Sequence, residues 1–445
     1  MSLEPQPIDC LISARWVVPV EPEGVVLPNH SVAVREGAIE AVLPTEEALK
    51  RFNAAEHVDL GAHALIPGLV NLHTHAAMTL MRGLADDLPL MQWLEKHIWP
   101  AEAKHVSSQF VHDGTMLACA EMLGGGITTF SDMYFFPEDA ARAALESGMR
   151  AAIGIIAIEF PTAYASDPDD YIQKGLAARD ALKSESRLSF CMAPHAPYTV
   201  SDKTFEHILV LAEELDLPIQ VHLHETQEEI KGSLAAHGKR PLERLRALGL
   251  VGPRLIAVHG VHFSDAEISG LALANASVAH CPSSNLKLAS GLAPVAALLD
   301  HGVNIGLGTD GAASNNRLDL FQEMRLAALL AKGSSERADV MPAARALTAA
   351  TLGGARALSL DGRIGSLLPG TRADLCAVRL DGTGLVPCYD PISHLVYAAG
   401  RENVTHVWVD GRILLNERQL TSINVADLYK NTHLWQNKLL SETKA

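Results

Sequence analysis

The sequence predicts an α/β protein built on a (β/α)8 TIM barrel, with a small composite β-sandwich domain formed by both chain ends. Three observations lead to this prediction: a length of 445 residues, short apolar runs that alternate with helical stretches through the middle of the chain, and a β-rich pattern at each end. A barrel of this kind takes roughly 250–350 residues. The chain therefore has room for one barrel and a second, smaller domain.

Eight short apolar runs, each of a length suited to a β-strand, follow one another through the middle of the chain. They are Ala64–Leu69, Thr128–Ser131, Ala151–Ile158, Leu188–Ala193, Ile219–His222, Leu255–His259, Ser277–His280 and Val303–Gly308. Stretches of helical pattern lie between them, namely Asp113–Leu123, Phe205–Leu215, Arg240–Leu248 and Pro294–Leu299. Because such alternation is typical of parallel strands joined by helical crossovers, the eight repeats predict a closed barrel.

The two ends of the chain carry a different pattern, of short strands separated by turns. The strand-like runs include Ser31–Val34, Ile39–Val42, Asp374–Val378 and Val404–Val409. Neither end has enough residues to bury much apolar surface by itself. We therefore expect residues 1–63 and 366–445 to form one composite β-rich domain, and residues 64–365 to form the catalytic barrel.

The bulk composition narrows the classes of partner and the cellular compartment. A formal net charge of −16 repels phosphate backbones and anionic lipid head groups, so we expect no nucleic-acid or membrane partner. Six scattered cysteines include no CxxC pair, which is typical of reduced thiols in a cytoplasmic protein. We expect no signal peptide, because the first residues lack a basic segment and a long apolar core. No apolar run reaches the ~18 residues that would suggest a membrane span.

Histidine and aspartate side chains stand at the carboxyl ends of several predicted strands. His73 and His75 form an HxH pair at the end of the first strand, and alternate residues of a strand point to the same side, so both imidazoles can face one ion. His222 ends the fifth strand, His259 ends the sixth and Asp310 follows the eighth. One such residue alone could be structural, but the whole set lies at the face where a barrel carries its chemistry, and it predicts a metal site. Imidazole and carboxylate ligands with an open position suit a catalytic Zn²⁺.

The PGLVNLHTH run at residues 67–75, together with the polar strand ends above, resembles the amidohydrolase superfamily over nearly the whole chain. The metal ligands that this resemblance implies are His73, His75, His222 and Asp310. It also implies that His259 holds the water beside the metal. Some members of the superfamily bind two metals through a modified lysine that ends strand four, but that strand here, Ser189–His195, has no lysine. We therefore expect one Zn²⁺ per subunit, or another divalent transition metal in its place.

These groups can carry out a hydrolytic deamination. A bound Zn²⁺ lowers the pKa of water from 15.7 to about 7, which supplies hydroxide for attack on a ring carbon that bears an amine. Asp310 can take the proton of the water, and Glu225 can protonate the ring nitrogen and the departing ammonia. Glu225 could instead be a residue at a helix amino terminus that the helix dipole stabilises. The neighbouring Glu228 and Glu229 are interpreted as solvated helix charges.

A sharper resemblance is to the 5′-methylthioadenosine/S-adenosylhomocysteine deaminases. The matching segments are Leu90–Leu94, Trp99–Glu102, Ala193–Thr199, His222–Thr226 and His280–Gly291. The resemblance implies that Glu102 binds the ribose hydroxyls, that His195 contacts the nucleoside and that Glu225 meets the purine; a carboxylate is a natural acceptor for a vicinal diol. Trp93 is expected to pack on the sugar or on the thioether. The ordinary alternatives are a surface helix charge for Glu102, core packing for Trp93 and a structural strand-end role for His195.

The segment after the third strand bears on the choice of substrate. Some members of the family carry an arginine there that could pair with the homocysteine carboxylate, whereas Ile155–Thr162 has no arginine and contains Glu159. The sequence therefore favours 5′-methylthioadenosine as the purine nucleoside substrate, with adenosine and S-adenosylhomocysteine secondary. The products would be the inosine analogue and ammonia. The resemblance also suggests a homo-oligomer.

Two alternative functions are weighed against this one. A guanine deaminase-like or chlorohydrolase-like enzyme of the same superfamily, acting on a free base or a triazine, would share the His280–Gly291 motif. Such a substrate has no ribose diol for Glu102, so comparing a nucleoside with its free base separates the two. A non-enzymatic barrel scaffold would have no reason to keep every predicted ligand together with Glu225.

Overall fold

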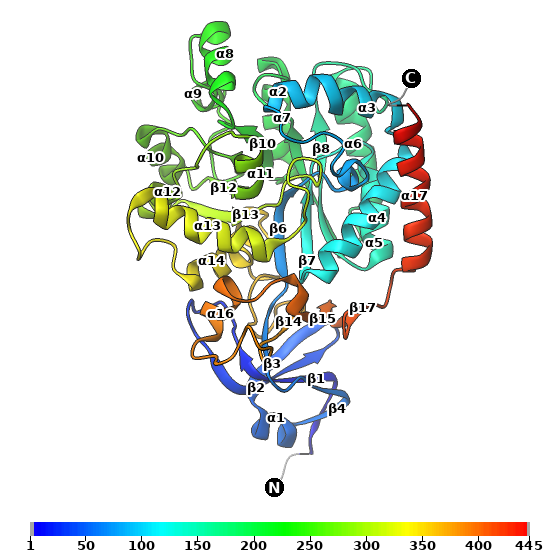
Figure 1. Cartoon of the computed structure of the whole chain (residues 1–445), viewed down its shortest axis with the longest axis vertical. Coiled ribbons are helices and arrows are strands. Elements are labelled where there is room, and N and C mark those ends of the chain that lie inside the picture. The colour runs from blue at the N-terminus through cyan, green and yellow to red at the C-terminus, as the bar shows by residue number, and fades with distance from the viewer. Residues whose placement is uncertain (1–3, 443–445) are drawn as a thin grey trace.

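The computed structural model describes residues 4–442 and divides into two regions. In Figure 1 the barrel and its surrounding helices fill the upper part of the molecule, and strands from both chain ends form a sheet at the bottom. The last helix, α17 (Val425–Glu442), runs back along the side of the barrel. The predicted barrel and the predicted β-rich region built from both ends are confirmed.

Eight parallel strands form a nearly closed barrel. They are β6 (Leu69–Thr74), β7 (Ile127–Asp132), β8 (Arg150–Ala157), β9 (Leu188–Pro194), β10 (Ile219–Leu223), β11 (Leu255–His259), β12 (Ser277–His280) and β13 (Asn304–Leu307). Each strand pairs with its neighbours in chain order, from β6 to β13. Nearly all strand residues are buried, because helices cover the outer face and side chains fill the interior.

Polar contacts join the first barrel strand to the segment that follows the last one. The Asn71 side chain donates to Thr309 Oγ1 (2.7 Å) and accepts from the Thr309 N–H (2.9 Å). The Asp310 N–H donates to the His73 carbonyl (2.9 Å). These bonds hold β6 against the end of β13, so the carboxyl ends of the strands surround a common space.

Strands from both chain ends form one nine-stranded sheet with a core of its own. They are β1 (Gln6–Val17), β2 (Leu27–Arg35), β3 (Ala38–Pro44), β4 (Phe52–Asp59), β5 (His63–Pro67), β14 (Leu375–Arg379), β15 (Val404–Val409), β16 (Arg412–Asn416) and β17 (Gln419–Leu420). The two ends meet where β5 pairs antiparallel with β14, with Leu65 opposite Ala377. Buried side chains from both ends, including Ile12, Val32 and Trp408, pack into one cluster, which explains why neither end needs to fold alone.

Helices connect the barrel strands and cover the barrel. The helical elements are α1 (Thr45–Arg51), η1 (Ala76–Met81), α2 (Leu90–Trp93), η2 (Leu94–Ile98), α3 (Trp99–His105), α4 (Ser108–Gly124), α5 (Pro137–Ser147), α6 (Pro168–Leu182), α7 (Asp202–Leu215), α8 (Gln227–His237), α9 (Pro241–Ala247), α10 (Asp265–Leu273), α11 (Pro282–Lys287), α12 (Val295–Asp300), α13 (Leu320–Ser335), α14 (Ala343–Ala349), α15 (Leu352–Ala357), α16 (Pro391–Tyr397), η3 (Arg401–Asn403) and α17. Three of them begin at a serine, Ser107, Ser201 or Ser264, whose hydroxyl accepts a backbone N–H of the first turn.

One predicted strand is wrong. The apolar run Ala64–Leu69 was expected to be the first barrel strand, but most of it is β5 of the terminal sheet, and the barrel begins with β6 at Leu69. The chain passes from one sheet to the other at Gly68, where a Cβ would lie within 2.7 Å of the Thr128 side chain. Both strands are fully buried, so their apolar pattern does not reveal the break between two sheets.

The carboxyl-terminal helix packs on the barrel side of the molecule. The Trp435 ring lies 5.2 Å from the Phe110 ring of α4, centroid to centroid, and its Nε1–H donates to Asp113 Oδ2 (2.8 Å). These contacts indicate that α17 stabilises the barrel.

The domain limits expected from the sequence, at 63/64 and 365/366, stay a prediction.

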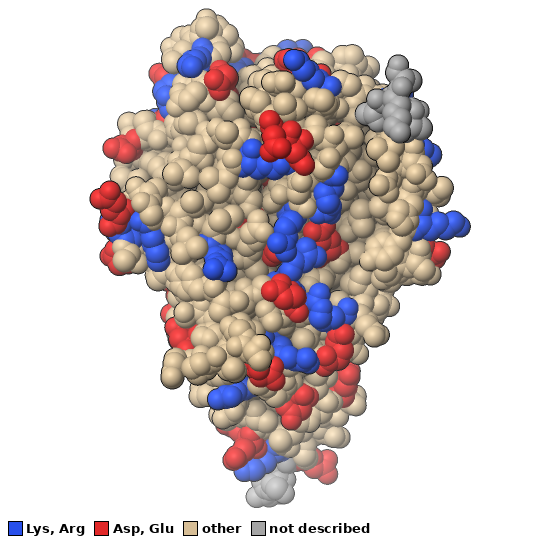
Figure 2. Space-filling model, in the orientation of Figure 1, with Lys and Arg blue, Asp and Glu red and all other residues tan. Residues whose placement is uncertain are grey.

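Charged side chains of both signs mingle on the face of the molecule shown in Figure 2. The net charge of −16 is thus not gathered there into one acidic patch. Among residues 4–442, no helix is both long enough and apolar enough to cross a membrane.

Candidate metal centre and substrate pocket

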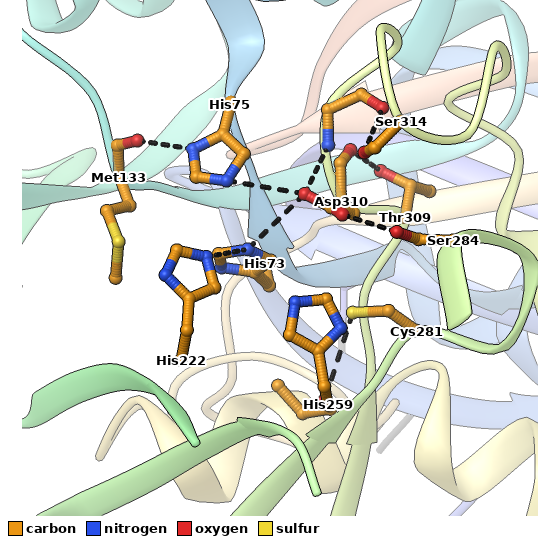
Figure 3. Close-up of polar contacts among 12 residues, drawn as sticks. His73, His75, Met133, His222, His259, Cys281, Ser284, Thr309, Asp310 and Ser314 are labelled. Carbon is orange, nitrogen blue, oxygen red and sulfur yellow. Dashed lines mark hydrogen bonds and ion pairs between the residues drawn. The ribbon is translucent and has the colours of Figure 1, made fainter. Parts of the chain in front are cut away.

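Four imidazoles and one carboxylate meet at the carboxyl end of the barrel (Figure 3). The Nε2 atoms of His73 and His222 are 3.2 Å apart. Asp310 Oδ1 lies 3.6 Å from His73 Nε2 and 3.3 Å from His75 Nε2. His259 joins the group from the end of β11, with its ring stacked 5.5 Å from the ring of His222. All five residues that the sequence placed at the metal therefore lie together.

Each of these imidazoles is oriented by a hydrogen bond from its other nitrogen. The Nδ1–H groups of His73, His75, His222 and His259 donate to Gln220 Oε1 (3.0 Å), the Met133 carbonyl (2.6 Å), the His195 carbonyl (2.7 Å) and Asn285 Oδ1 (2.9 Å), respectively. This pattern leaves the Nε2 lone pairs facing the shared centre. A hydrogen bond at one ring nitrogen that sets the orientation of the other is characteristic of metal-binding histidines.

Asp310 is held by two donors of its own. Ser284 Oγ–H donates to Oδ2 (2.6 Å), and the Gly311 N–H donates to Oδ1 (2.7 Å). Ser284 lies in α11, within the His280–Gly291 motif, but the sequence did not assign it a role of its own. The sequence also assigned no role to Gln220 or Asn285. The only hint of their contacts in the sequence was a polar residue within a buried strand or a short helix.

Burial keeps two of these imidazoles, those of His73 and His222, neutral. Burial lowers the pKa of His73 to about 4, and burial lowers that of His222 well below its ordinary value, with the neighbouring imidazoles adding to the effect. Burial by itself would raise the pKa of Asp310, but the hydrogen bond with His73 and the interactions with His75 and His259 outweigh it, so this pKa is well below its ordinary value. Neutral imidazoles and an ionised carboxylate are the protonation states in which these residues can bind a metal ion.

The backbone is strained at three residues that follow or end barrel strands near the cluster. His224, His259 and Asp310 have φ values of 55°, 70° and 61°, in the left-handed region that non-glycine residues seldom occupy. If the strand continued past His222, the His224 side chain would point to the same side as His222. The left-handed conformation turns the chain instead, and His224 Nε2 accepts the N–H of Leu242 in α9 (3.0 Å). Backbone strain of this kind clusters at functional sites.

Glu225 lies beside the imidazole cluster, in the loop after β10. Its Oε2 is 3.8 Å from His259 Nε2. Burial, and secondarily the charge of Asp310, raise the pKa of Glu225 to about 8, so the protein environment favours a protonated side chain at neutral pH. A proton donor is therefore available at the edge of the cluster.

The prediction made for Glu229 is wrong. It was expected to be a solvated helix charge, but its side chain is buried, and the residue is only 7% exposed, whereas Glu228 is exposed. Its carboxylate accepts the backbone N–H groups of His224 (3.0 Å) and Glu225 (2.8 Å). Glu229 thus holds the backbone from which the Glu225 side chain extends.

A pocket of about 350 Å³ opens above the cluster. Trp93, Glu102, His195 and Glu225 all line it, together with His75, His222, His259 and Asp310. The volume is near the lower end of the range of small-molecule sites. Every residue assigned to substrate from the sequence therefore faces the same cavity.

Glu102 lines the same pocket as the cluster. The Tyr134 hydroxyl donates to Glu102 Oε1 (2.7 Å), and burial raises the pKa of Glu102 to about 7 despite that bond. Trp93 Nε1–H donates to the Ala85 carbonyl (3.1 Å), which fixes the indole in the wall. His195 is held by Thr199 Oγ1 (2.8 Å) and is kept neutral, because burial lowers its pKa to about 3. Among the described residues that line this pocket, none is a lysine or an arginine.

The donor atoms fit a transition-metal ion in two overlapping groups. One group is His73, His75 and Asp310; the other is His73, His222 and His259; the donor atoms of each lie within 4.8 Å of one another. A His/His/Asp cluster with oriented Nε2 atoms suggests a metal site, and nitrogen and oxygen donors of this kind suit zinc. His73 belongs to both groups and is completely buried, so it is the anchor of either arrangement.

Comparison with known proteins agrees with this geometry. The sequence profile of the amidohydrolase family matches residues 64–414. The 5-methylthioadenosine/S-adenosylhomocysteine deaminase of Saccharophagus degradans is 49% identical over 436 residues, which cover 98% of each chain. The crystal structure of an adenosine deaminase from Xanthomonas campestris with bound zinc has a TM-score of 0.97 and 49% identity, and the match covers 98% of this chain and 100% of the other. The atrazine chlorohydrolase TrzN from Arthrobacter aurescens, complexed with zinc, shares the fold at 24% identity, with a TM-score of 0.88 and 96% and 99% coverage.

Proposed function

The chain belongs to the amidohydrolase family, and we propose that it is a zinc-dependent hydrolase that deaminates the adenine ring of 5′-thio-substituted adenosines. The products are the inosine analogue and ammonia. One observation carries the proposal: a protonated Glu225 beside the imidazole cluster and the Glu102 carboxyl group line the same cavity. A proton donor and a diol acceptor in one cavity match the purine and the ribose of a nucleoside.

The proposed metal is one Zn²⁺ per subunit, held by His73, His75, His222 and Asp310. His259 is assigned to the reacting water, because its Nε2 also lies 3.8 Å from Glu225, the group that must exchange protons with the substrate. Zinc, when bound, supplies Lewis acidity that lowers the pKa of water to about 7. Another divalent transition metal with a preference for nitrogen and oxygen donors could replace it.

Three side chains of the protein move or hold protons in the proposed reaction. Water adds to C6 of the purine, with His259 Nε2 oriented to hold it and Asp310 accepting its proton. Glu225 protonates the ring nitrogen N1 and then transfers the proton of the new C6 hydroxyl to the amino group, so that the C6–N bond breaks and ammonia leaves. The proton held by Asp310 returns to Glu225, which restores both side chains. The raised pKa of Glu225 suits the acid role, and the lowered pKa of Asp310 keeps this carboxylate ionised, so that its oxygens are available to the metal and the water.

The ribose binds to Glu102 in this proposal. A carboxylate accepts hydrogen bonds from two vicinal hydroxyls, and Tyr134 already occupies one lone pair of Oε1, which orients the group. His195 contacts the nucleoside, and the Trp93 indole packs against the sugar or the thioether. Saccharophagus degradans and Xanthomonas campestris relatives, named for deamination of the same nucleoside class, support this substrate.

5′-Methylthioadenosine is proposed as the preferred substrate, ahead of adenosine and S-adenosylhomocysteine. The support is electrostatic: the described lining of the pocket has no lysine or arginine that could pair with the carboxylate of a homocysteine tail. The measurement is kcat/KM for ammonia release with each nucleoside. A larger value for S-adenosylhomocysteine than for 5′-methylthioadenosine would overturn the preference but not the chemistry.

The alternative substrates are tested in the same assay. A zinc-loaded preparation would be given 5′-methylthioadenosine, S-adenosylhomocysteine, adenosine, adenine and guanine. Turnover of nucleosides with adenine and guanine inert is the expected result, because only nucleosides present a diol to Glu102. If only guanine or a triazine were turned over, the protein would be a free-base or triazine hydrolase instead. If the zinc-loaded protein turned over none of these compounds, a non-enzymatic scaffold would be favoured.

A homo-oligomer in the cytoplasm completes the proposal. The six cysteines form no disulfide, as expected in a reducing compartment. The oligomer is inferred by resemblance to the family, and sedimentation equilibrium of the zinc-loaded protein would measure it. A monomer at micromolar concentration would overturn that part alone.

A further inference from the structure

A second cavity, of about 570 Å³, lies beside the substrate pocket. It is bounded by the segment between β9 and α7, by one side of α8 and by residues near the start of α3. Trp99, Phe160 and Tyr198 line both cavities. Among the described lining residues, only these three are common to both cavities, and we call them the aromatic partition.

The partition is built from three separate segments. Trp99 begins α3, Phe160 follows β8 and Tyr198 follows β9. The Trp99 and Phe160 rings meet edge to face, with centroids 5.8 Å apart, and the Tyr198 ring lies 6.0 Å from the His195 ring. Phe160 and Tyr198 are 37% and 39% exposed, so neither is locked in a core. Side chains held so loosely can change rotamer when a ligand group passes between them.

Arg244 and the exposed His237 are the basic side chains among the described lining residues of the second cavity. Arg244 is the one arginine there, and its guanidinium donates to Asp202 Oδ1 (2.6 Å), to the Val200 carbonyl (2.9 Å) and to the Pro197 carbonyl. Glu159 accepts the Ser201 N–H (2.9 Å) and the Thr204 hydroxyl (2.7 Å). The charged groups are thus engaged with the protein.

The remaining lining is largely apolar or small. It includes Met91, Pro197, Val200, Gly232 and Ala236, besides the aromatic partition. With two glutamates present and the arginine already paired, this lining disfavours a carboxylate and accommodates an uncharged group. Such a surface gains free energy by covering apolar area of a ligand.

The position of the proposed substrate determines which part of it could reach this cavity. The purine must approach Glu225 and the metal ligands at the base, and the ribose diol must face Glu102 in the wall. The 5′ substituent is the part left to extend towards the aromatic partition, the part of the lining that the two cavities share. We propose that the second cavity is a subsite for uncharged alkyl or aryl groups attached through sulfur at the 5′ position, reached between Phe160 and Tyr198. This inference rests on the proposed function.

The first test compares substrates of increasing length. The zinc-loaded protein would be given 5′-methylthio-, 5′-butylthio- and 5′-phenylthioadenosine, with S-adenosylhomocysteine as a long but charged member. We expect the butylthio and phenylthio compounds to keep a kcat/KM within about tenfold of the methylthio compound. S-Adenosylhomocysteine should be worse than both. A steep fall with length, equal for neutral and charged tails, would overturn the subsite.

The second test fills the second cavity with a bulky side chain placed on α8. Gly232 lies in α8 and lines the second cavity but not the first, and a Cβ there would meet nothing within 4 Å among the described residues. Gly232→Trp should lower the ratio of kcat/KM for the phenylthio compound to that for the methylthio compound by at least about tenfold. Ala236→Trp, one turn further along α8, should act in the same direction. An unchanged ratio in both variants would overturn the proposal.

The matched control is a tryptophan on the same helix that faces away from the cavity. Leu234 is 46% exposed and lines neither cavity, so Leu234→Trp should leave the ratio unchanged. A fall equal to that of Gly232→Trp would show that any bulky residue on α8 acts through the helix, and would overturn the subsite.

A binding measurement separates this inference from the proposed function. Isothermal titration with 5′-phenylthioinosine, the expected product, needs no turnover. Tighter binding than 5′-methylthioinosine, lost in Gly232→Trp, would support the subsite even if no deamination were found. Deamination of 5′-methylthioadenosine without that difference would keep the proposed function and overturn the subsite.

Discussion

The two ends of the barrel handle buried polar groups in opposite ways. At the carboxyl end, the imidazoles use one nitrogen for a protein hydrogen bond and leave the other facing a shared centre. At the amino end, the guanidinium of Arg150, the first residue of β8, is fully engaged. It donates to Asp374 Oδ2 (2.9 Å), Asp410 Oδ1 (2.8 Å) and the Ser186 carbonyl (3.0 Å).

The difference teaches how to separate chemistry from stability in this fold. The Arg150 cluster joins the barrel to the terminal sheet, and its charges satisfy one another. The metal-centre cluster instead leaves imidazole Nε2 atoms facing a shared centre, and it holds two of its members, His259 and Asp310, in left-handed backbone conformations. Groups that a structure pairs completely contribute to folding, and groups that it orients but leaves available contribute to binding and catalysis.

The largest expected effect comes from removing a proposed metal ligand. His222→Asn should lose zinc and lower kcat by several orders of magnitude, since an imidazole donor is removed while its neighbour His73 remains. The measurement is zinc per subunit by atomic absorption together with kcat. His259→Asn is the comparison: it should keep zinc and lose activity. Zinc retained by His222→Asn and lost by His259→Asn would reverse the assignment of ligands.

Glu225→Gln should lower kcat by about 10²–10⁴-fold while zinc stays bound, because an amide cannot donate the proton that the ring nitrogen needs. Steady-state kinetics and metal content test this directly. Wild-type turnover in the variant would remove Glu225 from the acid role.

Asp374→Asn addresses the opposite end of the barrel. Breaking one partner of a buried ion pair costs about 3–5 kcal/mol, so the unfolding free energy in urea should fall by that amount, while kcat below the unfolding transition is unchanged. The exposed pair of Asp180 and Lys183 supplies the control, and Asp180→Asn should change stability little. Lost activity in a folded Asp374→Asn protein would contradict the division between the two ends.

Glu229→Gln should have a smaller effect, of about 10–100-fold on kcat, because the amide can accept only one of the two backbone N–H groups that position Glu225. KM, zinc content and the melting temperature should change little, which separates positioning from general destabilisation. Glu228→Gln, at the adjacent exposed position, is the matched control and should behave like the wild type. Equal losses in both variants would remove the positioning role.

Acidification should release zinc only at low pH. The pKa of the His73 imidazole is lowered to about 4, so the ring stays neutral at pH 6, where an ordinary histidine, with a pKa of about 6.5, would be protonated. Because protons compete with the metal for the same nitrogens, zinc content should hold at pH 6 and fall as the pH drops below about 4. Dialysis at stepped pH followed by metal analysis measures this. Release between pH 6 and 7 would contradict it.

The sequence by itself determined the barrel and the members of the site. Apolar strands alternating with helices require parallel pairing, and parallel strands bring their carboxyl ends to one face, so His73, His75, His222, His259 and Asp310 had to meet. These are local properties of each strand and the residue at its end. Glu102, Trp93, His195 and Glu225 followed from resemblance, and the structure places all four in one cavity.

Only the tertiary structure decided what surrounds that site. Gln220 of β10, together with Ser284 and Asn285 of α11, orients the cluster through contacts with other elements, which no spacing along the chain reveals. Glu229 looked like a surface charge until packing buried it against the Glu225 backbone. The run Ala64–Leu69 divided between two sheets, because burial on both faces produces the same apolar pattern in either one. Sequence pattern records whether a side chain is buried, whereas the partner it meets depends on how distant segments pack.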